Sequence, residues 1–234
     1  MFDNFFEIFY DIFIKGKAYK LMLDGLVYTL VIAVFAVLLG VILGALLAVC
    51  KVIPQKNIIS KFFNGVANVY ITVFRGTPVM VQLLLFYYGI FPRVMRGYEY
   101  KALIIAILVF GLNSAAYVAE IIRSGILSID KGQMEAGRSL GFTYSQTMMK
   151  IILPQAIKNI LPALGNEMIT LLKDTSLVSV IALRDVTKQA QNIISKTYEP
   201  YIPYISLAII YLVIVIILTK LLGILERRLR KSER

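Results

Sequence analysis

The run from Gly25 to Cys50 contains no charged residue. A helix needs about 20 mostly apolar residues to cross roughly 30 Å of bilayer hydrocarbon, so this run predicts a membrane-spanning helix. Hydrophobic residues make up 59% of the 234 residues, which exceeds the roughly 45–50% of soluble domains. The sequence therefore predicts an all-α integral membrane protein with one domain.

Four further stretches are long and apolar enough to cross a bilayer. Arg75 and Pro78 interrupt the first of them, and several charged residues interrupt the third. The five predicted spans cover about residues 25–50, 62–90, 102–122, 156–183 and 201–225. No repeat relates the two halves of the chain, which argues against a complete inverted-repeat transporter in one chain.

An odd number of spans places the two termini on opposite sides of the membrane. If the C-terminus is cytoplasmic, the inside segments hold 12 Lys and Arg residues and the outside segments hold 9. Positive residues favour the cytoplasmic side, so we expect the N-terminus outside and the basic tail 226–234 in the cytoplasm. This orientation also places the polar loop 123–155 in the cytoplasm.

The first twenty residues carry aromatic and acidic residues on separate helical faces. Phe2, Phe5, Phe6, Phe9 and Phe13 recur at helical spacing, and three acids occupy another face. Segment 1–20 is therefore predicted to be an amphipathic helix in the membrane interface, with a disordered tail as the alternative. The transmembrane domain then covers residues 21–225.

Small residues recur every four positions along the first span. Ala36, Gly40, Gly44 and Ala48 share one helical face, which allows another helix to approach closely. The sequence leaves open whether that helix belongs to the same chain or to a second copy.

The composition offers little for catalysis. The chain has no histidine and one cysteine, Cys50, so no metal site and no catalytic residue are predicted. The net charge is +11. Because the basic residues flank apolar spans, we expect them to contact anionic lipid headgroups and expect no nucleic-acid partner. No phosphate-binding loop occurs, so ATP must bind another polypeptide.

A polar segment from Asp130 to Ala156 stands out because it must lie outside the bilayer. It contains Gly132, the triplet Glu135-Ala136-Gly137, Gly141 and then Ile152-Leu153-Pro154. This pattern resembles the EAA loop of membrane subunits of ATP-binding-cassette (ABC) importers. Glycine stands at the third position of the triplet, where the pattern has alanine.

Three further stretches are similar to the branch of this family that imports polar amino acids. They are Arg75-Gly76-Thr77-Pro78 followed by Gln82, Asn113 to Glu120, and Leu172 to Leu177. The resemblance covers about residues 20–225 and implies a type I ABC importer permease in a bacterial or archaeal cell membrane. It also implies a second permease subunit in a homodimer, two ATPase subunits that hold ATP and Mg, and an extracytoplasmic solute-binding protein.

The resemblance further implies a coupling helix that docks on the ATPase. Met134 and Leu140 offer apolar anchors, Glu135 and Arg138 present charge, and Gly141 can end the helix with a positive φ. An ordinary solvated loop is the alternative. The residues predicted to couple to the ATPase are Gln133, Met134, Glu135, Ala136, Gly137, Arg138, Leu140 and Gly141.

Polar residues inside predicted spans are costly and tend to face an aqueous cavity or protein interior. Glu167 is the predicted ligand for a cationic group of the substrate, and Pro78 is expected to open the backbone of the second span. The predicted substrate-binding residues are Glu167, Asn166, Thr170, Tyr117, Asn113, Thr77, Pro78 and Gln82. Many family members have glutamine at the position of Glu167, and an acid there is typical of carriers of cationic amino acids.

Four other charged residues are predicted to form an intramembrane charge network: Arg75, Glu120, Lys173 and Asp174. The leading hypothesis is an amino-acid importer permease for arginine, lysine or histidine, with glutamine or glutamate as the alternative cargo. A secondary transporter or channel subunit, in which Glu167 and Glu120 handle protons or cations, is the alternative from another class.

Overall fold

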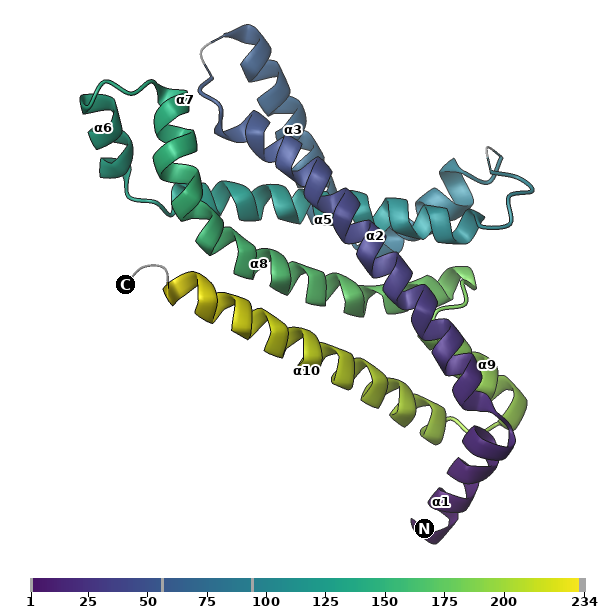
Figure 1. Cartoon of the computed structure of the whole chain (residues 1–234). Helices are drawn as coiled ribbons and strands as arrows, with labels where there is room; N and C mark the ends of the chain where they lie inside the picture. The colour runs from purple at the N-terminus through teal and green to yellow at the C-terminus, as the bar shows by residue number, and fades with distance from the viewer. Residues whose placement is uncertain (1, 56, 94, 232–234) are drawn as a thin grey trace. The chain divides into compact units, whose positions relative to one another are not determined.

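A computed structural model describes residues 2–55, 57–93 and 95–231, and those ranges hold helices and connecting turns without a strand (Figure 1). The α-helices are α1 (Phe2–Phe9), α2 (Ala18–Val52), α3 (Ile58–Gly76), α4 (Val79–Leu84), α5 (Lys101–Leu127), α6 (Lys131–Ser139), α7 (Tyr144–Thr147), α8 (Leu153–Asp174), α9 (Val186–Thr197) and α10 (Tyr201–Lys231). Three π-helical segments, η1 (Tyr10–Lys15), η2 (Leu85–Ile90) and η3 (Met148–Ile152), and a 3₁₀ segment, η4 (Thr175–Ile181), complete the set.

The chain divides into two compact units that are described separately. The first unit takes residues up to Ala36, then Val79–Phe110 and Ile169–Leu218. The second takes Val37–Pro78, Gly111–Met168 and the residues from Thr219 onward. Helices α2, α5, α8 and α10 contribute residues to both units.

Three of the described helices are long and apolar enough to cross a membrane: α2, α5 and α10. A fourth span results if α3 and the helix pair Val79–Ile90 that follows its break are counted together. Helix α8, the fourth span predicted from the sequence, is not among them, because Glu167 and three other charged residues lie within its 22 residues. The five-span count and the orientation of the termini therefore stay predictions.

The first unit is built on a hydrophobic cluster that the N-terminal segment completes. Phe13 is buried in one cluster with Met22 of α2, Val186 and Ile193 of α9, and Ile202 at the start of α10. Phe9 stacks on Phe13 with ring centroids 5.0 Å apart. The N-terminal segment is thus helical rather than a disordered tail, and part of its aromatic face packs on the protein itself. Its location in the membrane interface stays a prediction.

The second unit owes its close packing to the small residues of α2. A Cβ added to Gly44 would lie 2.6 Å from Val118 Cβ on α5, and one added to Gly40 would lie 2.9 Å from Ser114 Oγ. Ala48, one turn further on, is also buried. The ladder of small residues therefore serves packing within the chain, which answers the question that the sequence left open.

Helix α3 ends where the sequence predicts an interruption. Thr77 is extended, with φ −123° and ψ 143°, because a residue before proline is disfavoured in the helical region. The Thr77 hydroxyl donates to the carbonyl of Val73 at 2.8 Å, and so satisfies one of the carbonyls at the helix end. The predicted opening of the backbone before Pro78 is thus present in the described chain.

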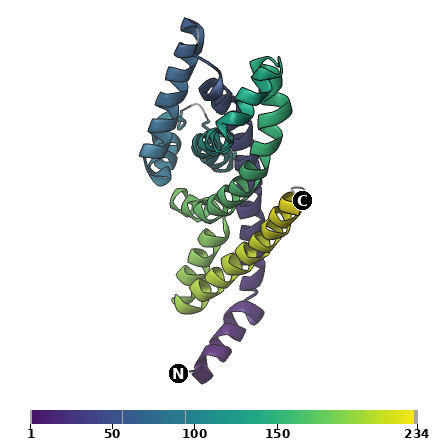
Figure 2. The same cartoon turned by 90° about the vertical axis from the view of Figure 1, so that its left-hand side faces the viewer.

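Helices α6 and α7 lie side by side in the second unit, joined by a short turn (Figures 1 and 2). Tyr144 of α7 donates its hydroxyl to the carbonyl of Val52 at 3.3 Å, which ties this pair to the end of α2. The polar loop of the sequence is therefore a folded helical pair.

Candidate functional site: the coupling helix and the polar face of helix α5

The boundaries of α6 are set by specific capping residues. The Asp130 side chain accepts a hydrogen bond from the backbone N–H of Gly132 at 2.7 Å at the start of the helix. Gly141 follows its last residues with φ +87°, a conformation that favours glycine. The sequence predicts this helix at about Gln133 to Leu140, whereas α6 runs from Lys131 to Ser139. The predicted positive φ of Gly141 is confirmed.

Gly137 has a packing role that explains its presence in the triplet. A Cβ there would lie 2.5 Å from Thr147 Cγ2, 2.9 Å from Thr147 Oγ1 and 3.2 Å from Ile151 Cδ1. Thr147 is fully buried, and its hydroxyl donates to the Thr143 carbonyl at 3.0 Å. Alanine would therefore collide with α7, so glycine at this position lets α6 and α7 pack closely.

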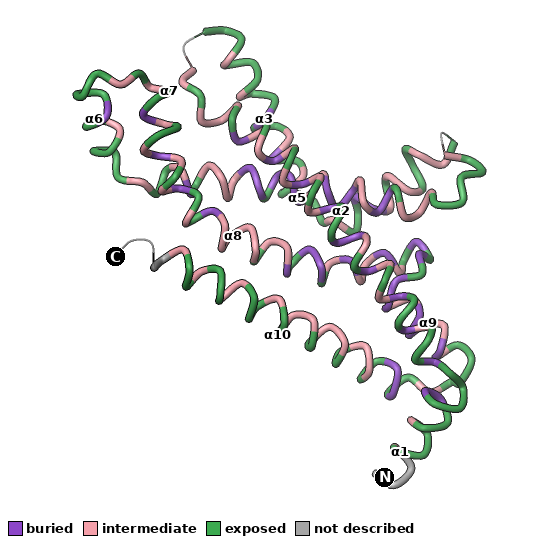
Figure 3. The backbone as a smooth tube through the Cα atoms, viewed as in Figure 1, coloured by how far each residue is buried: buried purple, intermediate pink, exposed green. Residues whose placement is uncertain are grey.

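Most of α6 faces solvent in the described structure (Figure 3). Gln133, Glu135, Ala136 and Arg138 are exposed, as is Leu140 just beyond the helix, at 77%. These side chains could meet a partner, although the Arg138 guanidinium also donates to the Phe142 carbonyl at 2.7 Å.

Met134 is less exposed than the other predicted coupling residues on the surface of α6. It is half-buried and lines a cavity of about 250 Å³ behind α6, together with Arg123, Tyr144 and Ile152. Leu140 is therefore the more exposed apolar side chain of the predicted pair of anchors, and the docking role of both stays a prediction.

Helix α5 carries Asn113 and Tyr117 of the predicted substrate-binding residues, and α3 meets it there. The Asn113 side chain donates to the Phe74 carbonyl at 3.1 Å, one turn from the break at Thr77. The Arg75 guanidinium lies 5.2 Å from the ring centroid of Tyr117. The structure therefore brings the last turn of α3 against the predicted substrate-binding face of α5.

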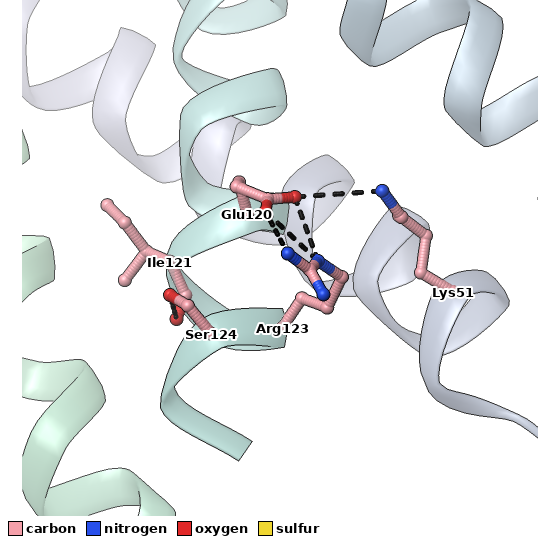
Figure 4. Close-up of polar contacts among 5 residues, drawn as sticks. All are labelled: Lys51, Glu120, Ile121, Arg123 and Ser124. Atoms are coloured by element: carbon pink, nitrogen blue, oxygen red, sulfur yellow. Dashed lines mark hydrogen bonds and ion pairs between the residues drawn. The ribbon is translucent and has the colours of Figure 1, made fainter. Parts of the chain in front are cut away.

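Glu120 forms a charge cluster of its own (Figure 4). Arg123 Nε lies 3.0 Å from each Glu120 carboxylate oxygen, and Lys51 Nζ of α2 lies 3.6 Å from Oε2. Neither cation belongs to the predicted network of Arg75, Glu120, Lys173 and Asp174. Lys51 and Arg123 thus add to the charges predicted around Glu120, and the contact with Lys51 ties α5 to α2. The network of Arg75, Glu120, Lys173 and Asp174 stays a prediction. Lys173 and Asp174 lie at the end of α8 in the first unit.

Glu167 meets a partner that the sequence did not identify. Ser114 of α5 donates its hydroxyl to Glu167 Oε1 at 3.0 Å, and Ser114 is buried. The neighbouring Asn166 is exposed and donates to the Pro162 carbonyl at 3.2 Å. The predicted substrate-binding residues are divided between the two units. The first unit holds Thr170 and Gln82, and the second holds Glu167, Asn166, Tyr117, Asn113, Thr77 and Pro78.

The first unit contains a buried carboxylate that sequence reasoning missed. Asp185 is fully buried and caps α9 by accepting from the backbone N–H groups of Thr187 at 3.0 Å and Lys188 at 2.8 Å. Burial raises the pKa of Asp185 to about 6. The Asp-Val-Thr-Lys sequence at a helix start is the signal that could have revealed this cap.

Comparisons with known proteins agree with this architecture. A model of the family "Binding-protein-dependent transport system inner membrane component" matches residues 36–231. The arginine transport system permease protein ArtQ of Bacillus subtilis is 42% identical over 91% of this chain and 94% of its own length. A putative glutamine transport system permease protein GlnP of Rickettsia typhi is 38% identical over 89% and 92% of the two chains.

A solved structure gives the same result in three dimensions. The chain is similar to one in the crystal structure of an amino acid ABC transporter with histidines, at a TM-score of 0.83 and 46% identity, over 92% of this chain and 96% of that one. These matches confirm the family resemblance seen in the sequence. The chain therefore belongs to the family of binding-protein-dependent transport system inner membrane components and is an amino-acid ABC transporter permease, not an enzyme.

Proposed function

We propose that two copies of this chain form the pathway of an importer for cationic amino acids, with Glu167 as the ligand for the cationic side chain of arginine, lysine or histidine. The observation that carries the proposal is a half-buried carboxylate within α8. If α8 spans the bilayer as the sequence predicts, an acid within it costs about 2.5–3.5 kcal/mol, which favours a functional role for Glu167. Two relatives are named for arginine and glutamine, so glutamine is the competing cargo.

The remaining ligands are proposed from their chemistry. Asn166 is exposed one residue before Glu167 and offers neutral hydrogen bonds. The opened backbone near Thr77 could accept or donate to the substrate's polar groups. Thr170 and Gln82 belong to the first unit, so they remain candidates on the sequence alone.

Transport energy is proposed to enter through α6. An ABC importer permease works with a separate ATPase and a solute-binding protein. We assign two exposed contacts to the ATPase: Glu135 of α6 and Leu140 just beyond its end. ATP and Mg would remain on that subunit, and closure of the ATPase pair would move α6 together with α7, because Gly137 packs directly on Thr147.

The test is uptake by the complete transporter in proteoliposomes. The permease, its ATPase and its binding protein are reconstituted, and uptake of labelled arginine, lysine, histidine, glutamine and glutamate is measured with and without ATP. We expect ATP-dependent uptake in which the cationic amino acids have the highest kcat/KM. A preference for glutamine or glutamate would overturn the assigned cargo, and uptake without ATP or ATPase would overturn the importer mechanism.

A further inference from the structure

Ser114 donates its hydroxyl to the Glu167 carboxylate, with 3.0 Å between the hydroxyl oxygen and Oε1. Ser114 is only 2% exposed, and its neighbours Ala115 and Ala116 are fully buried. A serine hydroxyl has a single proton to donate. Because this proton goes to a carboxylate, the bond is of the charge-assisted kind, which is shorter and stronger than bonds between neutral groups.

Helix α2 passes close to this hydroxyl at Gly40. A Cβ on Gly40 would lie 2.9 Å from both Cβ and Oγ of Ser114, and 3.4 Å from the backbone nitrogen of Ala115. The absence of a side chain at Gly40 is therefore what leaves room for the serine. Helix α2 thus lies close to Ser114, which in turn bonds to the carboxylate on α8.

We propose that Ser114 is a positioning residue that holds the Glu167 carboxylate in the orientation that selects a cationic amino acid, with Gly40 as its backing. The proposal rests on the proposed role of Glu167 as a substrate ligand. Ser114 is assigned no contact with the substrate. Its hydroxyl is neutral, so it orients Glu167 without cancelling the negative charge that a cationic side chain requires.

The first experiment compares variants of Ser114 in the complete transporter in proteoliposomes. Ser114→Ala removes the hydroxyl, and we expect the KM for arginine to rise about tenfold while the maximal rate and the basal ATPase rate hold, since hydrogen bonds to charged groups are the strong ones. Ser114→Cys keeps a similar side-chain volume and a weak hydrogen-bond donor, so its KM for arginine should lie between those of wild type and Ser114→Ala. Ser124→Ala is the matched control, because Ser124 also lies on α5 and its hydroxyl donates to a backbone carbonyl, that of Ile121 at 3.1 Å (Figure 4).

A second pair of variants tests the contribution of Gly40 and leaves Ser114 unchanged. Gly40→Ala places a methyl group against the Ser114 hydroxyl and should raise the KM for arginine as Ser114→Ala does. Gly44→Ala is the control one turn away, where the new methyl would meet Val118 instead, at 2.6 Å. We expect Gly44→Ala to lower the unfolding midpoint without changing the KM for arginine.

A double-mutant cycle separates positioning from a general loss of structure. In the Glu167→Gln background, Ser114→Ala should cause no further rise in KM, because the group that it orients is already changed. An equal rise in both backgrounds, or a Ser114→Ala transporter with wild-type KM for arginine, would overturn the proposal. If Glu167→Gln alone leaves arginine uptake unchanged, then the proposed function itself fails, which is a distinct result.

Discussion

Replacing Gly137 with alanine puts a methyl group where α6 touches α7. The added Cβ would lie 2.5 Å from Thr147 Cγ2 and 2.9 Å from its Oγ1, both closer than normal contact. Thr147 cannot turn away freely, because it is fully buried and bonded to the Thr143 carbonyl. Overpacking costs about 1–3 kcal/mol, and distances this short place Gly137→Ala in the upper half of that range.

Part of this cost is returned, because alanine is a better helix former than glycine by about 1 kcal/mol. The net loss is therefore about 1–2 kcal/mol, which corresponds to a roughly fivefold to thirtyfold change in an equilibrium constant. If α6 and α7 act as one body on the ATPase, that loss should appear as weaker docking. Gly137→Ala should raise the apparent Kd of the ATPase for the permease about fivefold or more.

The assay titrates purified ATPase against permease in nanodiscs and reads binding together with amino-acid uptake per ATP hydrolysed. Gly65→Ala is the matched control, since a methyl group there meets nothing within 4 Å. Thr147→Ser removes the nearest methyl group, Cγ2, and should restore much of the affinity in the double variant. Wild-type affinity and coupling in Gly137→Ala, or a defect that Thr147→Ser does not relieve, would refute the reasoning.

Two further predictions concern charged groups away from α6. The pKa of Asp185 is about 6 in the folded state and 3.8 in the unfolded state, so the folded state binds the proton more tightly. The unfolding midpoint should therefore fall as the pH rises from about 4 to about 6. The free energy of unfolding should drop by about 3 kcal/mol at most over this range. Asp185→Asn should abolish this slope in thermal melts, and a slope that persists would contradict the assignment. Glu120→Gln should lower the free energy of unfolding by about 1–3 kcal/mol, because Arg123 and Lys51 lose their charged partner. The control is Glu7→Gln, since Glu7 is exposed. Equal melting midpoints for the two variants would contradict a stabilising role of Glu120.

Local features were predictable from the sequence because each has a short-range cause. The helix break before Pro78 follows from proline geometry, and the positive φ of Gly141 follows from the chemistry of helix ends. The small-residue spacing of Gly40 and Gly44 indicated close helix packing, although only the structure shows that α5 is the neighbour. These features depend on residues within a few positions of one another.

Contacts between helices were not predictable, because they depend on the register of one helix against another. Arg123 lies three residues after Glu120, so helical spacing alone predicts that pair. The approach of Lys51 from α2 cannot be predicted in this way. Ser114 stands within the Asn-Ser-Ala-Ala motif, yet nothing local indicates that it reaches Glu167. Helix α8 was predicted to span the membrane, but it is not among the described helices found long and apolar enough to do so, and it contains four charged residues, so its span stays a prediction.

The claim that Glu167 selects a cationic cargo is tested most directly by one ratio. In proteoliposomes that contain the complete transporter, kcat/KM for arginine is divided by kcat/KM for glutamine, in wild type and in Glu167→Gln. We predict that arginine is favoured in wild type and that Glu167→Gln lowers the ratio at least about tenfold, because a neutral amide loses the charge-assisted contact. A ratio that Glu167→Gln leaves unchanged would contradict the role of this carboxylate in selecting the substrate.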